Sequence, residues 1–174
     1  PPHVDLSYSN WDNLELNKKS VRAFKKLFSI LNEESYSKID VKDKIRIGIV
    51  SEFFTDHTIG KLYKDLIFSL DKNKFETFVF HSRKTFTGDI FNEFKEKEKE
   101  GILKNELLPV KLTEKINVIK DSKLDIIFYP DIGMSIEFYY LALIRLAKYQ
   151  ITTFGHPETT GSNSVDYYLI SKNC

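Results

Sequence analysis

The sequence predicts an α/β fold, in which a parallel sheet has helices on both faces and is preceded by one amphipathic helix. Short runs rich in β-branched and aromatic residues alternate with stretches whose apolar residues recur every three or four positions. Two runs, IRIGIV at 45–50 and LDIIFY at 124–129, are nearly all apolar, which is typical of strands buried on both faces. The spacing between runs fits one helix each, so we expect parallel strands joined by right-handed crossovers.

Residues 1–43 are predicted to form a helical segment and a linker that precede the sheet. After an irregular start, apolar residues at spacings of three, four and seven predict a helix over 11–32, with basic residues on its other face. A basic amphipathic helix can meet a membrane or a partner helix, but more often it covers a core. Residues 33–44 are polar and lack an apolar period, as expected of a linker.

Residues 44–174 are predicted to form the sheet domain. We expect strands at 45–50, 75–80, 107–110, 124–129, 149–154 and 165–170. We expect helices at 59–70, 89–100, 113–121 and 136–147. The order of these elements is that of successive βα units, with no internal repeat.

Length, charge and composition exclude several classes of protein. The chain has 174 residues, which suits one domain or one lobe of a larger fold, and its net charge of +1 gives no indication of a nucleic-acid or acidic partner. The single cysteine, Cys174, rules out an internal disulfide framework and indicates a reducing compartment, so we expect a cytoplasmic protein. No apolar run is long enough to span a bilayer. The abrupt ends of the chain indicate a fragment of a longer protein.

Several familiar site motifs are absent from the sequence. The first strand is followed neither by G-x-G-x-x-G nor by a Walker motif, which argues against a dinucleotide-binding domain or a P-loop enzyme. No cluster of cysteine and histidine has the spacing of metal ligands, and there is no G-x-S-x-G elbow. The polar residues in loops after strands favour binding of a phosphorylated or sugar ligand over covalent catalysis.

Two of these loops offer one candidate side chain each. His57 lies just before a helix, in SEFFTDHT at 51–58, where it can donate to an anion or accept a proton. A helix N-terminus also favours phosphate-like charge. Alternatively, this loop is solvated, and Asp56 or Thr58 caps the helix. Asp131, in the loop after LDIIFY, could bind a hydroxyl or could be a turn residue near proline and glycine.

The third loop, GHPETTG at 155–161, follows the fifth expected strand. Its glycines let backbone amides approach a ligand, its proline stiffens the turn, and its histidine, glutamate and threonines supply donors, acceptors and a candidate acid or base. On the pattern alone, an ordinary connection with solvated polar residues is an equally good interpretation. Since parallel strands end at one edge of a sheet, we expect His57, Asp131 and His156 to cluster there. We expect His81, which ends a strand, to lie away from these loops.

Two stretches of the chain carry several short motifs in a fixed order. Residues 45–82 combine a strand, a loop with Ser51, Phe53 and His57, a helix and an F-E-x-F strand. Residues 124–171 combine an L-D-I strand, a glycine loop, a helix ending in L-I-R-L-A, then GHPETTG and D-Y. Both stretches resemble the catalytic region of the O-linked N-acetylglucosamine transferase family, and the second resembles it more closely. The N-terminal helical segment is similar to the one that precedes this region in bacterial members.

Two motifs depart from the form that many members of that family have. Many have Asn-His-Pro where this chain has Asp-His-Thr at 56–58, and many have Gly-Tyr-Pro-Gly where it has Gly-His-Pro-Glu at 155–158. The Gly-His-Pro form resembles bacterial members, including relatives that glucosylate asparagine. The resemblance therefore leaves open which sugar is transferred and whether the acceptor is Ser/Thr or Asn.

The resemblance implies the N-terminal lobe of a GT-B glycosyltransferase, in which two Rossmann-like lobes face a cleft. Such an enzyme transfers N-acetylglucosamine or another hexose with inversion, from UDP-N-acetylglucosamine or UDP-glucose to a protein or peptide, and uses no metal or other cofactor. It also implies helical repeats or a C-terminal nucleotide-binding lobe elsewhere in the full-length chain. His57 is the implied catalytic residue and faces the sugar diphosphate. The implied substrate-binding residues are Asp131, Gly155, His156, Pro157, Thr159, Thr160 and Gly161.

The same loops also fit a non-catalytic α/β module that recognises a partner or a small anion. A second Rossmann-like lobe further along the reading frame would support the enzyme, whereas a stop codon would support the module. For the enzyme, we expect the 174-residue chain alone not to turn over a UDP-sugar.

Overall fold

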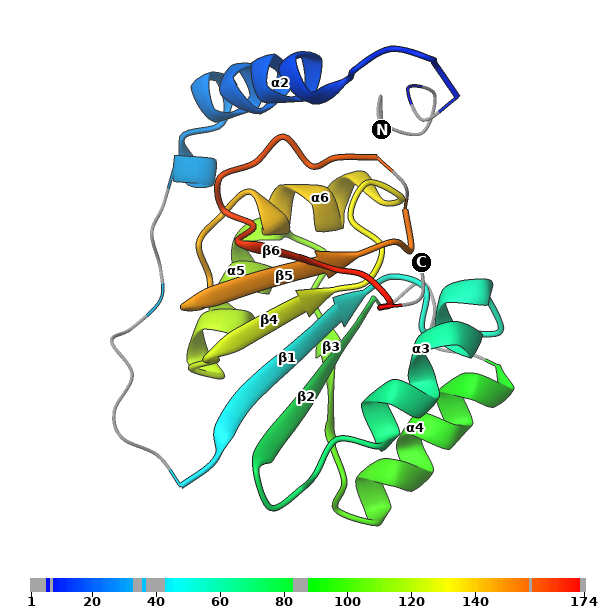
Figure 1. Ribbon diagram of the computed structural model, residues 1–174. Helices are drawn as coiled ribbons and strands as arrows, with labels where there is room; N and C mark the ends of the chain where they lie inside the picture. The colour runs from blue at the N-terminus through cyan, green and yellow to red at the C-terminus, as the bar shows by residue number, and fades with distance from the viewer. Residues whose placement is uncertain are drawn as a thin grey trace.

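The computed structural model describes residues 6, 8–32, 36, 43–82, 88–156 and 158–172. Their strands form one six-stranded sheet in the order β3-β2-β1-β4-β5-β6, and all neighbours are parallel (Figure 1). The predicted α/β fold with a parallel sheet is therefore confirmed, and the arrangement is Rossmann-like. The strands are β1 (Ile45–Ser51), β2 (Phe75–Ser82), β3 (Lys104–Leu108), β4 (Ile126–Tyr129), β5 (Tyr149–Thr153) and β6 (Tyr167–Leu169). The helices are α2 (Leu14–Leu27), the 3-10 turn η1 (Ser29–Asn32), α3 (Thr58–Phe68), α4 (Asp89–Lys99), α5 (Leu112–Asp121) and α6 (Ile136–Ala142).

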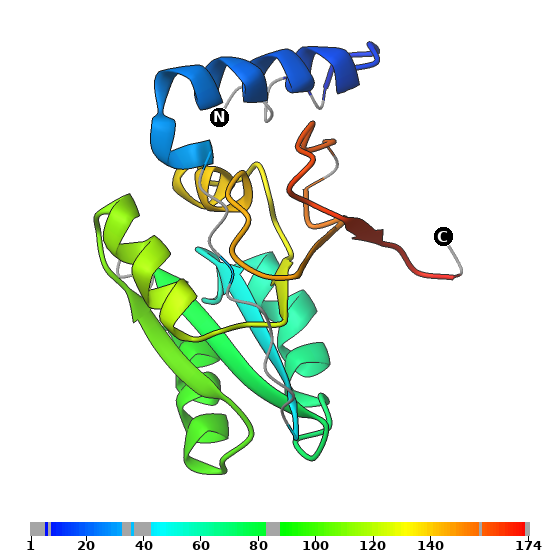
Figure 2. The same cartoon turned by 90° about the vertical axis from the view of Figure 1, so that its left-hand side faces the viewer.

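Helices cover both faces of the sheet. On one face, α3 and α4 bury their apolar side chains in a cluster that includes Ile49 and Phe128 of the strands. On the other face, α5 and α6 pack in a larger cluster that includes Val50 and Ile127 (Figure 2). Successive side chains of a strand point to opposite faces, so neighbouring residues of β1 and of β4 belong to different clusters.

Helix α2 lies outside α6 and covers part of the core (Figures 1 and 2). Its Val21 is buried in the cluster on that face of the sheet. The ring of Phe24 meets the rings of Tyr139 and Tyr140 edge-on, at centroid distances of 6.4 and 5.4 Å. The helix thus has the core-covering role that is the commoner one for such a sequence.

The order of the strands defines a switch point between β1 and β4. From β1 the chain adds β2 and β3 on one side, and from β4 it adds β5 and β6 on the other. In open α/β sheets, the crevice outside the carboxyl ends of the strands at such a point is the common ligand site. The order of the strands therefore makes the loops that follow β1 and β4 the first candidates for a ligand site.

The bounds of three predicted elements are wrong. The helix expected at 11–32 begins at Leu14 and is interrupted at Phe28, whose extended backbone ends α2 before η1 begins. The third strand lies at 104–108 rather than 107–110, because this edge strand pairs with β2 through the polar segment KNELL and leaves Val110 exposed. The helix expected at 136–147 ends at Ala142, and the buried Gln150 carboxamide then accepts a hydrogen bond from Leu146 N. The other expected boundaries in the sheet domain agree within two residues. The expected irregular start and linker lie largely outside the described residues.

Candidate functional site

Three loops meet at the carboxyl edge of the sheet. They follow β1, β4 and β5, which are neighbours in the sheet, so the loops begin side by side. His57, Asp131 and His156 lie in these three loops, and all three therefore lie at one edge, as expected from parallel topology. The switch point lies between the first two loops.

A buried hydrogen bond joins β1 to the loop after β4. Ser51, the last residue of β1, donates through Oγ to Asp131 Oδ2 at 2.9 Å, and the same Oγ accepts from Phe53 N at 2.9 Å. Asp131 is only 6% exposed. Burial raises the pKa of its carboxyl from 3.8 to about 7, although the Ser51 hydrogen bond opposes that shift. Near neutral pH this carboxyl can therefore either accept or donate a hydrogen bond.

Two glycines let the third loop press against its neighbours. A Cβ on Gly155 would lie 2.1 Å from Pro130 O and 3.0 Å from Ile59 Cδ1. Gly133 has a φ of +103°, and a Cβ there would lie 3.0 Å from Nδ1 of His156. No other residue fits at Gly155, because a side chain would meet backbone there. The second and third loops thus touch directly, and the His156 ring lies against the second loop.

His156 is buried, and its ring favours the neutral form. Burial lowers the pKa of the imidazole below 6.5, although the charge of Glu158 opposes this shift. Its Nδ1 accepts a long hydrogen bond from Glu158 N at 3.4 Å. A neutral ring that accepts at Nδ1 carries its proton on Nε2, so His156 can donate from Nε2.

His57 is the N-cap of α3. Its Nδ1 accepts from Ile59 N at 3.2 Å, which satisfies one of the free amides of the first helical turn. The ring packs against Phe53 with centroids 4.7 Å apart and a tilt of 37° between the ring planes, and the side chain is half-buried. With Nδ1 occupied, the neutral ring carries its hydrogen on Nε2 beside the amino-terminal end of the helix.

The residue before His57 caps a different helix. Asp56 Oδ1 accepts from Ile90 N in the first turn of α4, at 3.1 Å. The prediction that Asp56 or Thr58 caps the helix after the first strand is therefore wrong. Instead, Asp56 caps the start of α4 and His57 caps the start of α3. The loop after β1 is therefore fixed to both helices.

The second half of the third loop turns toward α2 rather than toward the switch point (Figure 2). Thr159 O accepts from Asn17 Nδ2 at 2.9 Å. Thr160 uses its hydroxyl oxygen within the loop, where it accepts from Ser162 N at 3.3 Å. Gly161 has a φ of +63°, and its Cα faces the backbone of α2 so closely that a Cβ would lie 2.6 Å from Asn17 C.

The expected single ligand loop is therefore divided between two places. Gly155 and His156 lie beside the switch point, whereas 159–161 line a separate hollow of about 370 Å³. Pro157 lies outside the described residues. The other side chains around the hollow include Leu14, Lys18, Tyr167 and Tyr168.

Sequence reasoning missed two polar partners of the candidate residues. Ser51 was noted only as part of a motif, although a residue that ends β1 must lie beside the loop that follows the adjacent β4. Asn17 gave no signal, because an asparagine within an amphipathic helix is ordinarily solvated. Only the three-dimensional structure brings it to Thr159.

His81 is a core histidine that touches one of the three loops. Its ring packs edge-on against Phe54, 5.9 Å away, so the expectation that it lies away from the loops is wrong. Its Nε2 pairs with Asn105 Oδ1 at 2.8 Å, and burial lowers its pKa to about 4. A neutral ring held in this way stabilises the core, and no described contact assigns it a role in the site.

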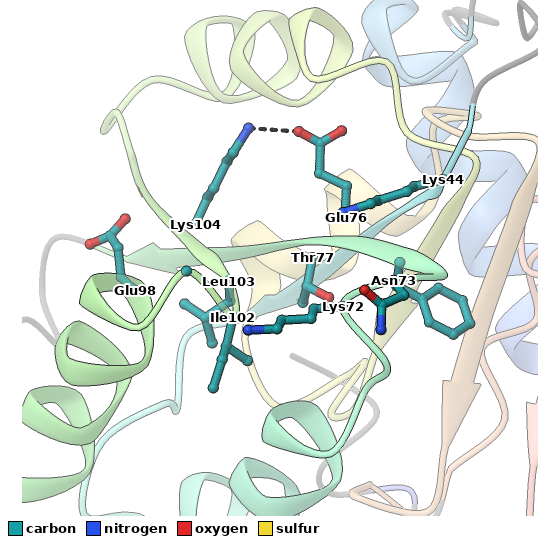
Figure 3. Close-up of a pocket in the computed structure, with 11 residues that line it drawn as sticks. Lys44, Lys72, Asn73, Glu76, Thr77, Glu98, Ile102, Leu103 and Lys104 are labelled. Carbon is teal, nitrogen blue, oxygen red and sulfur yellow. Dashed lines mark hydrogen bonds and ion pairs between the residues drawn. The ribbon is translucent and has the colours of Figure 1, made fainter.

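A wider hollow, of about 490 Å³, lies at the opposite edge of the sheet (Figure 3). Charged side chains near the amino ends of β1, β2 and β3 surround it. Glu76 accepts from Lys104 Nζ at 2.6 Å and from Arg46 Nε at 2.7 Å, so its charge is already paired. The lining includes Lys44, Lys72, Asn73, Glu98 and Lys104.

The described residues include no candidate metal site and no candidate membrane span. No three of their histidine, cysteine, aspartate or glutamate side chains gather in a way that could hold a metal ion. None of their helices combines the length and apolar character needed to cross a membrane.

The fold is similar to that of a known glycosyltransferase. A solved structure of a mutant O-GlcNAc transferase from Thermobaculum terrenum matches with a TM-score of 0.74 and 17% sequence identity. The match covers 95% of this chain and 32% of that one, so the chain spans about a third of the neighbour's length. At this identity the similarity shows the fold alone. No family model matches the chain, and no curated protein matches it either.

Proposed function

We propose that the chain is the N-terminal lobe of an inverting GT-B glycosyltransferase and faces a C-terminal nucleotide-binding lobe. The proposed donor is UDP-N-acetylglucosamine or UDP-glucose, and the proposed acceptor is a Ser or Thr hydroxyl of a protein or peptide. The observation that carries the proposal is the meeting of Ser51, Asp131 and His156 at the switch point of the sheet. Buried polar groups at that place are typical of a ligand crevice. The single cysteine supports a cytoplasmic location.

In this proposal His57 stabilises the departing diphosphate. The acceptor oxygen attacks the anomeric carbon on the face opposite UDP, and the bond from that carbon to the diphosphate oxygen breaks with its electron pair. The acceptor proton passes to a base or proton relay. Negative charge grows on the diphosphate, and the Nε2–H of His57 and the start of α3 favour it increasingly. This transfer requires no metal ion.

Asp131 and His156 are proposed to hold the sugar. A sugar hydroxyl both donates and accepts hydrogen bonds, so it suits a carboxyl beside an N–H group. The Asp131 carboxyl can accept, and the His156 Nε2–H can donate. Because both side chains are buried, their hydrogen bonds to a bound sugar would be shielded from water.

The test measures donor binding and sugar transfer by the full-length protein, with UDP-N-acetylglucosamine and UDP-glucose compared in the presence and absence of EDTA. We expect transfer from at least one donor at a rate that EDTA leaves unchanged. His57→Asn removes the imidazole but keeps a side-chain acceptor for the helix cap, so we expect kcat to fall while the start of α3 stays capped. Lys72→Ala, beside the hollow at the amino edge, is the control and should keep full activity. If the folded full-length protein binds neither donor, the proposal is wrong, and binding without transfer would favour the non-catalytic module.

A further inference from the structure

Two side-chain amides hold the loop between β5 and β6, one from Asn17 of α2 and one from Asn13, the residue just before that helix. Asn17 Nδ2 donates to Thr159 O at 2.9 Å and lies 3.5 Å from Glu158 Oε1. Asn13 Nδ2 donates to Glu158 Oε2 at 3.1 Å. Both asparagines are buried, and Asn17 is fully shielded from solvent. Water competes little for these hydrogen bonds, so they fix Glu158 and Thr159 relative to α2.

The backbone of the loop also meets the backbone of α2. A Cβ on Gly161 would lie 2.6 Å from Asn17 C and 2.7 Å from Lys18 N. A side chain at this position would therefore push the loop and the helix apart. On its other side the loop is held by α6, where the Tyr139 hydroxyl donates to Thr160 O at 3.1 Å.

These contacts continue from α2 to the His156 ring. The asparagines hold the carboxylate of Glu158, and the backbone N–H of Glu158 donates to His156 Nδ1 at 3.4 Å. That hydrogen bond selects the tautomer with its proton on Nε2, because an accepting Nδ1 carries no hydrogen. Asn13, Glu158 and His156 thus form a chain of contacts that runs from α2 to the switch point.

Asn17 stabilises the loop through a hydrogen bond but contributes little to the stability of α2. Asparagine is a poor helix former, and the buried Oδ1 of Asn17 has no hydrogen-bond partner among the described residues. The first feature weakens the helix itself, and the second costs free energy once the helix is docked. The hydrogen bond that Asn17 donates to Thr159 O is the compensating contact. A poor helix former with an unpaired buried oxygen is expected where the side chain makes a contact that another part of the fold needs.

We propose that Asn13 and Asn17 are positioning residues, which orient the loop and, through Glu158, point the Nε2–H of the His156 ring at the bound sugar. The identity of that ligand rests on the proposed glycosyltransferase function, whereas the orientation of the ring is a property of this chain. Neither asparagine touches the donor. Loss of either one should leave the sheet intact, loosen the loop and let the His156 ring adopt both neutral tautomers.

The first test records the ring nitrogens of His156 by NMR in the 15N-labelled chain. We expect the Nε2-protonated tautomer in the parent and a mixture of tautomers in Asn13→Ala and Asn17→Ala. Amide exchange at 158–162 should rise roughly tenfold, as expected for one lost hydrogen bond. Asn92→Ala, at an exposed position of α4, is the matched control and should change neither signal.

A pair of glycine variants separates the contact with α2 from backbone strain. Gly161 and Gly101 have φ values of +63° and +69°, but a Cβ on Gly101 would meet nothing within 4 Å. Gly161→Ala should therefore produce the same tautomer mixture as Asn17→Ala, whereas Gly101→Ala should not. If His156 keeps a single tautomer in both Asn17→Ala and Gly161→Ala, the positioning role is wrong.

Kinetics of the full-length protein separate this inference from the proposed function. With UDP-N-acetylglucosamine as the probe, Asn17→Ala should raise KM roughly tenfold and change kcat less, because binding must then order the loop. An inactive parent that binds no donor would contradict the proposed function, while the His156 spectra would still decide whether α2 positions the ring. An active parent whose KM and kcat survive Asn17→Ala, despite mixed tautomers, would contradict the positioning role in ligand binding.

Discussion

The two edges of the sheet hold their polar side chains in opposite ways. At the amino edge, Glu76 pairs with Arg46 and Lys104 beside the wider hollow, and the Lys104 side chain is 55% exposed. At the carboxyl edge, Ser51 and Asp131 hydrogen-bond to each other with almost no contact with solvent. Water screens charges at the first edge but not at the second.

This difference is our reason for proposing the ligand site at the carboxyl edge, although the wider hollow lies at the amino edge. Exposed ion pairs contribute little, because water and salt screen them and long side chains must be ordered. Buried polar groups interact more strongly and are held in one geometry, as recognition of a small ligand requires. Substitutions should therefore have large effects at the carboxyl edge and small effects at the amino edge.

The largest expected effect is a pH dependence of stability that originates at Asp131. Its carboxyl has a pKa of about 7 in the folded chain and an ordinary value of 3.8, so the folded state holds a proton that the unfolded state has lost between these values. The stability this gives is fully present below pH 3.8 and is lost as pH rises through about 7. The loss is up to about 4 kcal/mol. Asp131→Asn should remove this pH dependence of the free energy of unfolding, as measured by urea unfolding between about pH 4 and pH 8.

Glu76 at the amino edge is the control for that measurement. The Lys104 hydrogen bond holds the pKa of Glu76 below its ordinary value of 4.5, so its contribution is present above that value and lost as pH falls. Glu76→Gln should therefore remove a small dependence of the opposite sign below pH 4.5 and leave the dependence at higher pH unchanged. An unchanged pH dependence in Asp131→Asn would show that this carboxyl is not the source.

The next largest effect is expected at Gly155. In Gly155→Ala the new methyl would meet Pro130 O at 2.1 Å, and backbone cannot rotate away as a side chain can. We expect a loss of about 3 kcal/mol in the free energy of unfolding, at the upper end for overpacking. Gly101 lies beside the hollow at the amino edge, and a methyl group there would meet no atom within 4 Å. In Gly101→Ala only the strain of a φ of +69° remains, so the free energy of unfolding should fall by about 1 kcal/mol. Equal losses in urea unfolding would contradict the close approach of the loops.

The third prediction ranks two side chains in the full-length protein, one from the loop after β1 and one from the part of the third loop that turns toward α2. His57→Asn removes the proposed donor to the diphosphate and should lower kcat on the order of a hundredfold, or about 3 kcal/mol. Thr160→Ala removes one hydroxyl whose acceptor is already used within the loop, so we expect about 1 kcal/mol, partly in KM. Steady-state kinetics with both UDP-sugars measure the ranking. A larger loss of kcat in Thr160→Ala would show that the role given to His57 is wrong.

The smallest effect is expected from Lys104→Met at the amino edge. The variant breaks the ion pair with Glu76, but Arg46 remains on that carboxylate and the site is partly solvated. We expect less than about 1 kcal/mol in the free energy of unfolding. The affinity for a UDP-sugar should stay within about twofold, as measured by calorimetry. A tenfold change in affinity would mean that the hollow at the amino edge takes part in binding.

The parallel fold could be predicted because its signals are local. The runs that form β1 and β4 are nearly all apolar, and parallel topology alone brings the loops with His57, Asp131 and His156 to one edge. The edge strand β3 was misplaced because it is largely polar, and apolar content alone drew the expected strand toward Val110.

The division of the third loop could not be predicted, because it depends on contacts between distant residues. Nothing within 155–161 shows that its second half meets a helix near the start of the chain. Asn13 and Glu158, which make that contact, are 145 positions apart. A single sequence gives periodicity and turn residues, but not which of two faces a loop of glycines and threonines will meet.

The docking of α2 on this loop also has a consequence for the order of folding. A contact between residues 145 positions apart closes a very long loop of chain, and the entropy lost must be offset before that contact helps. During synthesis, Val21 and Phe24 leave the ribosome long before α6 and the last loop can cover them. We therefore expect α2, which is made before the sheet, to be the last of these elements to dock, with its apolar side uncovered in the meantime.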